Sequence, residues 1–126
     1  MNTLEITLQR KIEGKWSVVV GRSASGSALP MRSEGELALN EADLQLLKQD
    51  AKAYGRMLGE SLFRGTVRDA FMQARSEAES SVRVLLNVED ESLRLLRWER
   101  LCGPVGNVWD FLALNQRAPY RCIYQA

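Results

Sequence analysis

The chain has 126 residues, 17 of them basic and 16 acidic, which gives a formal net charge of +1. A chain so close to neutrality has no general electrostatic field that would attract nucleic acid or an anionic membrane surface. Hydrophobic residues make up 45% of the sequence and no apolar run approaches about 18 residues, so we expect one domain over residues 1–126, without a nucleic-acid partner or a membrane span.

The N-terminal segment alternates apolar and polar residues, which is typical of half-buried strands. The apolar positions are Leu4, Ile6 and Leu8, followed by Trp16, Val18 and Val20. The intervening Glu13, Gly14 and Lys15 supply a turn, so the pattern predicts an N-terminal β-hairpin. Serine, glycine and one proline dominate the next segment, and we predict a flexible loop over residues of about 21–38, with a short extended piece at 28–31.

A helix is predicted to begin after Asn40, which can act as an N-cap. Glu41 and Asp43 place acidic groups near the positive end of the helix dipole. Apolar residues then recur at spacings of three and four, at Leu44, Leu47, Ala51, Tyr54 and Leu58. This pattern predicts one continuous helix with one apolar face, whose end is weakened by Gly55 and Gly59.

A second helix is predicted from about residue 62 to residue 79, where two serines break the pattern. Residues 82–88 are predicted to form a strand. Its run Val84-Leu85-Leu86 indicates burial on both faces and hence a central place in the sheet.

Asp90 is predicted to cap a short helical turn. Glu89, Asp90 and Glu91 could also offer oxygen ligands to a cation, but capping is the preferred interpretation. A turn-rich connection at 103–107 and two short strands, at 109–114 and 120–124, complete the chain. We therefore predict an α+β fold with an N-terminal β-hairpin and two central helices packed on a small mixed sheet, which the C-terminal strands complete.

Two further patterns admit a functional interpretation, and each has a plainer alternative. The glycine spacing at 21–27 resembles a phosphate-binding loop, but the required lysine is missing. A basic stripe lies on the predicted helices, at Lys52, Arg56, Arg64, Arg68 and Arg75, interrupted by Glu60. An RNA-binding face would need interleaved aromatic residues, so we expect a flexible loop and a solvated helix face.

The chain contains no histidine. A Cys–His peptidase dyad needs an imidazole to take the thiol proton and to protonate the leaving amine. We therefore expect no catalytic residue, no cofactor and no metal site, and no enzymatic activity of this chain by itself. Cys102 and Cys122 lie in apolar stretches and are expected to be reduced core thiols. The first residues lack the basic and apolar regions of a signal peptide, which indicates a cytoplasmic protein.

The C-terminal third carries a family resemblance. Leu96-Arg97-Trp98-Glu99-Arg100-Leu101, then Phe111-Leu112-Ala113-Leu114 and finally Tyr120-Arg121 resemble the N-terminal part of CHAT domains, which are bacterial caspase-like peptidase domains. Segments 58–63 and 82–86 are similar to earlier parts of the same family, so the resemblance covers most of the chain. The proline that usually precedes the Trp-Glu pair in this family is Arg97 here, which changes the backbone constraint at that point.

The resemblance implies a function. The catalytic histidine and cysteine of the family lie on later strands, beyond the position of Ala126. The implied role is therefore that of a non-catalytic N-terminal region of a CHAT-type caspase-like cysteine peptidase, serving as a docking or regulatory scaffold in bacterial defence or signalling. Its partners would be the catalytic half and a sensor or repeat module, with self-association through an exposed sheet edge. The alternative is a free-standing adaptor of the same fold that binds another protein.

Five residues form the structural signature and the candidate interdomain contact that this resemblance implies: Trp98, Glu99, Leu101, Phe111 and Arg121. We expect the Trp98 indole to pack over the sheet. A half-buried Glu99 is expected to pair with Arg121 or to accept backbone N–H groups, because a buried carboxylate needs such partners. The signature is interpreted either as architecture or as a support for the peptidase core.

Overall fold

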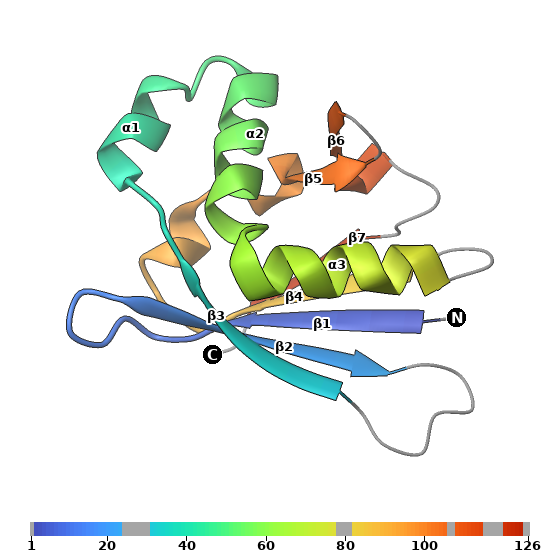
Figure 1. Cartoon of the computed structure of the whole chain (residues 1–126). Coiled ribbons are helices and arrows are strands. Elements are labelled where there is room, and N and C mark those ends of the chain that lie inside the picture. The colour runs from blue at the N-terminus through green and yellow to red at the C-terminus, as the bar shows by residue number, and fades with distance from the viewer. Residues whose placement is uncertain (1, 24–30, 78–81, 106–107, 115–119, 125–126) are drawn as a thin grey trace.

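The computed structural model describes residues 2–23, 31–77, 82–105, 108–114 and 120–124 (Figure 1). A five-stranded sheet has the strand order β3-β2-β1-β4-β7, and a second sheet pairs β5 with β6. The strands are β1 (Asn2–Leu8), β2 (Trp16–Ser23), β3 (Met31–Leu37), β4 (Val82–Val88), β5 (Cys102–Val105), β6 (Val108–Phe111) and β7 (Tyr120–Tyr124). The helices are α1 (Glu41–Leu46), α2 (Ala51–Leu62) and α3 (Gly65–Glu77), with 3₁₀ turns η1 (Leu93–Leu95), η2 (Trp98–Arg100) and η3 (Leu112–Leu114). The predicted α+β class is confirmed.

The centre of the large sheet follows the predicted pattern. Strands β1 and β2 form the antiparallel hairpin, and both Glu13 and Gly14 of its turn have positive φ angles, as a type I′ turn requires. Strand β4 lies parallel to β1 on one side and to β7 on the other, so its predicted central position is confirmed. Its burial is strongest toward the helices, because Arg83 is exposed and Leu85 is half-buried on the opposite face.

The predicted flexible loop over about 21–38 is wrong at both ends. Strand β2 continues to Ser23, and β3 pairs with it in antiparallel register, with Val18 opposite Gly35. The sequence does not predict β3 as a strand, because only Leu37 gives it an apolar core contact and charged residues occupy its other face. Residues 24–30 of the predicted loop lie outside the described part of the chain.

The single predicted helix starting after Asn40 is divided into two. The Asn40 side chain caps α1 as predicted, accepting a hydrogen bond of 3.1 Å from the Asp43 N–H. Asp50 then caps α2 in the same way, through a 3.1 Å bond from the Ala53 N–H, so the chain turns between the two helices. The second predicted helix begins at Gly65 (α3), whose positive φ ends the preceding turn, and not at residue 62.

The predicted turn at 103–107 and the predicted strand at 109–114 are also corrected. Strand β5 covers Cys102–Val105 and pairs with β6, and η3 follows directly after Phe111. Gly103 and Pro104 gave this segment the composition of a turn. Proline is tolerated here because a strand of a two-stranded sheet needs hydrogen bonds on one side only.

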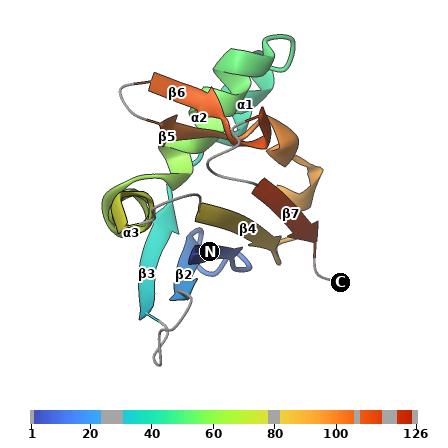
Figure 2. The same cartoon turned by 90° about the vertical axis from the view of Figure 1, so that its right-hand side faces the viewer.

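The core lies between the large sheet and the helices. Figure 1 shows the helices on one side of the sheet, and Figure 2 shows β5 and β6 above that same side. Helix α3 packs on β1, β2 and β3, whereas α2 packs against β5, β6 and η2. The ring of Phe71 in α3 lies 4.8 Å from the ring of Phe63, which directly follows α2. None of the described helices covers the opposite face of the sheet.

Candidate functional site

The signature segment is held in place by Asp90, directly after β4. Its carboxylate accepts hydrogen bonds from the Leu93 N–H (3.1 Å), the Ser92 hydroxyl (2.5 Å) and, from the distant hairpin turn, the Lys11 N–H (2.8 Å). The predicted capping role is thus confirmed. Burial opposes ionisation of Asp90, but the hydrogen bonds from Ser92, Lys11 and Leu93 outweigh it and hold the pKa of this carboxyl below its ordinary value of 3.8.

We expect Asp90→Asn to lower the free energy of unfolding at pH 7 by about 1–3 kcal/mol. Asparagine replaces one of the two accepting oxygens by an NH₂ group, which cannot accept a hydrogen bond from the surrounding donors. The pKa of Asp90 is lower in the folded state than in the unfolded chain, so its carboxylate stabilises the native protein fully at pH values above the unfolded-state pKa. This stabilisation is lost as the pH falls through the folded-state pKa. Urea unfolding at pH 7 and pH 3 measures both effects. The variant should lose less stability on acidification than the wild type. The exposed Glu91→Gln serves as the control, and equal stability of wild type and Asp90→Asn at pH 7 would contradict the cap.

Trp98 and Leu101 of the signature are architectural. Both side chains are fully buried in the main core. The Trp98 indole Nε1 donates a 2.7 Å hydrogen bond to the Leu93 carbonyl oxygen, which ties η2 back to η1. This pairing satisfies the one polar atom of a large apolar side chain.

Arg97 has a role that proline could not take. Its backbone N–H donates a 3.0 Å hydrogen bond to the Tyr54 hydroxyl of α2. Proline has no N–H, and the Arg97 φ of −91° lies outside the range of about −65 ± 15° that a proline ring allows. Arg97 is therefore coupled to Tyr54 by a contact that a proline at this position could not make.

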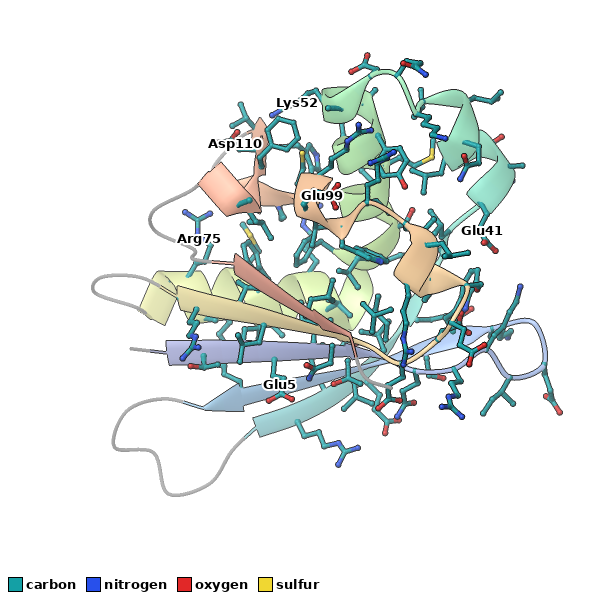
Figure 3. The ribbon with its side chains drawn as sticks, turned by 180° about the vertical axis from the view of Figure 1, so that it is seen from behind. Glu5, Glu41, Lys52, Arg75, Glu99 and Asp110 are labelled. Atoms are coloured by element: carbon teal, nitrogen blue, oxygen red, sulfur yellow. The ribbon has the colours of Figure 1, made fainter. Side chains whose placement is uncertain are left out.

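The remaining signature residues are Glu99, Phe111 and Arg121, and the expected half-burial of Glu99 is wrong. Glu99 is exposed, not half-buried, and has no hydrogen bond or ion pair with any described residue. Arg121 lies in β7 opposite Leu85, and its side chain is outside the described part of the chain, so the expected pair with Glu99 stays a prediction. Phe111 is half-buried in β6, where the Lys52 ammonium lies 4.8 Å from its ring centroid. The Lys52 Nζ also lies 3.5 Å from Oδ1 of Asp110 in β6, and Figure 3 shows these two residues next to each other.

Glu99 instead lines a groove with a volume of about 350 Å³. One wall comes from the end of α1 and the turn before α2, and the other from η1 and η2. The groove is lined by Gln45, Lys48, Tyr54, Leu95, Leu96, Arg97 and Glu99. Sequence reasoning missed it because the groove exists only where the chain turns between α1 and α2, and Asp50 was the one local signal for that turn.

A second surface is the sheet face opposite the helices, which we call the open face. It carries Glu5 and Thr7 of β1, Ser17, Val19 and Gly21 of β2, Arg32, Glu34 and Glu36 of β3, and Arg83, Leu85 and Asn87 of β4. Figure 3 shows Glu5 on this side, away from the helices. Asn87 is only 6% exposed, and its Nδ2 donates to Glu5 Oε1 (2.7 Å) and to Thr7 Oγ1 (3.4 Å). A shallow hollow of about 500 Å³ lies over Glu5, Val19 and Arg32.

Metal and thiol chemistry find little support among the described residues. Within them, no group of three or more His, Cys, Asp or Glu side chains is arranged to hold a metal ion. Cys102 is a free, buried thiol, as predicted, and burial raises its pKa although the nearby Lys52 favours the thiolate. The Cys122 side chain lies outside the described part of the chain. None of the helices in the described ranges is long and apolar enough to span a membrane.

The chain was also compared with known proteins. No protein-family model, no curated protein and no solved structure matches it.

Proposed function

We propose that this chain is a non-catalytic, cytoplasmic docking scaffold, and specifically the N-terminal region of a CHAT-type caspase-like cysteine peptidase in a bacterial defence or signalling system. The observation that carries the proposal is the open face of a sheet whose core strands are parallel. The sequence resemblance supplies the family, and the absence of histidine from all 126 residues leaves catalysis to a partner.

Parallel strands favour a second covering layer. Strands β1, β4 and β7 run parallel, whereas β2 and β3 make this a mixed sheet; parallel strand pairs are typical of sheets that are covered on both faces. On the open face, Val19 and Leu85 are half-buried, and the buried Asn87 is already paired with Glu5. A partner layer placed there would bury these apolar side chains without leaving the Asn87 amide unpaired.

The sheet also offers an edge next to the open face. Strand β7 is last in the strand order, and β4 is its one neighbour among the described strands. Its other side can accept a strand of the partner by β-augmentation, in which main-chain hydrogen bonds provide the affinity. Pairing with β7 would extend the sheet into the partner, and docking on the open face would cover the sheet with a second layer.

The double variant Val19→Lys with Leu85→Lys tests the open face. Each new lysine would stand opposite a glutamate on the neighbouring strand, Glu34 and Glu5 respectively, so the fold should tolerate both. We expect the tagged protein, recovered from its source cells, to lose its associated chain while its melting temperature stays unchanged. Thr66→Glu with Met72→Glu, on the exposed surface of α3, is the matched control and should retain that chain. Retention of the partner by the double lysine variant would refute docking on this face.

A free-standing adaptor of the same fold is the second candidate. It is favoured by the charged residues of the open face, among them Arg32, Glu34, Glu36 and Arg83, which keep such a face soluble without a permanent partner. The intact mass of the native gene product separates the two candidates. A mass far above 14.2 kDa, with histidine and cysteine in the added part, supports the peptidase region, whereas a mass of 14.2 kDa supports the adaptor.

A further inference from the structure

We infer that the groove between α1 and the η1–η2 segment is a binding site for an acidic peptide segment of a partner protein, in which a carboxylate lies next to a leucine-like side chain. This site is separate from the open face of the sheet, since its walls are helical elements on the other side (Figure 3). The inference therefore does not depend on the proposed peptidase context. Its volume of about 350 Å³ is within the range of ligand pockets, which begins at about 300 Å³.

Positive charge dominates the groove. Lys48 and Arg97 line it, and neither side chain has an ion pair or hydrogen bond with any described residue. Arg100 stands behind them, fixed by a 2.9 Å hydrogen bond from its Nη1 to the Lys48 carbonyl oxygen and by stacking 5.1 Å from the Tyr54 ring centroid. Glu99 is the single carboxylate of the lining. Two cations in the lining, with a third behind them, outweigh the one carboxylate and favour an anionic ligand.

The Tyr54 hydroxyl provides a hydrogen-bond donor at the base of the groove. Tyr54 is only 2% exposed, and its oxygen already accepts the Arg97 N–H. A phenol also has one O–H to donate, and no described residue accepts it. A buried donor without an acceptor is costly, so a ligand carboxylate oxygen arriving here satisfies a group that the described residues leave without an acceptor.

The wall formed by η1 also carries apolar side chains. Leu95 of η1 is 85% exposed and lines the groove next to Leu96. An exposed leucine beside the cationic side chains matches a peptide with an acidic residue next to an apolar one. A free inorganic anion would use the cations and leave Leu95 without a role.

The probe is the peptide acetyl-Leu-Glu-Glu-Leu-amide, titrated into the ¹⁵N-labelled full chain and followed by amide shifts. We expect saturable binding with the largest shifts at residues 45–48 and 95–99, and binding of the Gln-Gln analogue weaker by about tenfold, because charge-assisted hydrogen bonds are lost. Equal binding of both peptides, no saturation at millimolar concentration, or shifts confined to the open face would overturn the proposal. Free glutamate binding as tightly as the peptide would also overturn it.

Charge variants of the groove are expected to change the affinity for the peptide in opposite directions. Lys48→Gln and Arg97→Gln should weaken binding by about five- to tenfold, and Glu99→Gln should strengthen it by about threefold, since it removes the carboxylate that repels the ligand. These side chains are exposed, so the melting temperature should remain unchanged. Arg64→Gln, an exposed cation outside the groove, is the control and should leave the affinity unaltered. Weaker binding by Glu99→Gln would exclude a carboxylate ligand.

Discussion

Gly55→Ala is expected to lower the free energy of unfolding by about 3 kcal/mol or more, the upper range for overpacking a core. A Cβ at this position would overlap the Arg100 carbonyl oxygen and would lie 3.0 Å from Cys102 Sγ. Gly59→Ala should have a similar effect, because its Cβ would overlap the Cys102 carbonyl oxygen and lie 2.8 Å from Trp109 Cζ3. Both glycines let α2 approach the backbone of η2 and β5 directly.

The direction of this stability change is informative, because helix propensity alone predicts that alanine stabilises the helix at this position. In an exposed helix interior, alanine is more favourable than glycine by about 1 kcal/mol. Urea unfolding followed by circular dichroism decides between the two effects. Gly21→Ala in β2 is the matched control, since no atom lies within 4 Å of its Cβ position. If Gly55→Ala were as stable as the wild type, the close approach of α2 to Arg100 would be wrong.

Trp98→Ala is expected to be the second severe variant, with a loss of about 3–5 kcal/mol for removing a fully buried indole. Trp98→Phe separates the hydrogen bond from the packing. It keeps an aromatic ring but leaves the Leu93 carbonyl oxygen without its 2.7 Å donor, for an expected loss of about 1–3 kcal/mol.

The half-buried Trp109 supplies the control for the Trp98 variants. Trp109→Phe should be nearly neutral, because no described residue accepts a hydrogen bond from its indole. Equilibrium unfolding of the three variants by intrinsic fluorescence and circular dichroism measures the order of stability. Equal stability of Trp98→Phe and Trp109→Phe would show that the bond to Leu93 contributes nothing.

Several sequence-based predictions depend on one residue and its near neighbours, and these are confirmed. The Asn40 cap and the Asp90 cap each satisfy an N–H three residues ahead. The alternation in β1 and β2 and the apolar run of β4 likewise predicted these strands, although β2 extends three residues beyond Val20. Such signals are visible in a sequence because the interactions that produce them span only a few residues.

The candidate site was predictable only in part. The Trp98-Glu99 pair drew attention to the correct segment, but sequence reasoning expected Glu99 to be half-buried and paired, and it did not predict the groove that Glu99 lines. Its position in a groove depends on Tyr54 and Lys48, which are about fifty residues away in the chain. Contacts across such separations leave no periodic pattern in a single sequence.

The sequence by itself therefore determined the α+β class, the hairpin, the central strand, the caps and the lack of any histidine for a catalytic dyad. Only the tertiary structure decided the division of the first helix at Asp50, the strand character of the charged segment β3 and the pairing of β5 with β6. In each of these cases a contact partner distant in sequence supplies the stabilising hydrogen bonds or the buried surface. Local propensity was weak there, and the tertiary contacts prevailed over it.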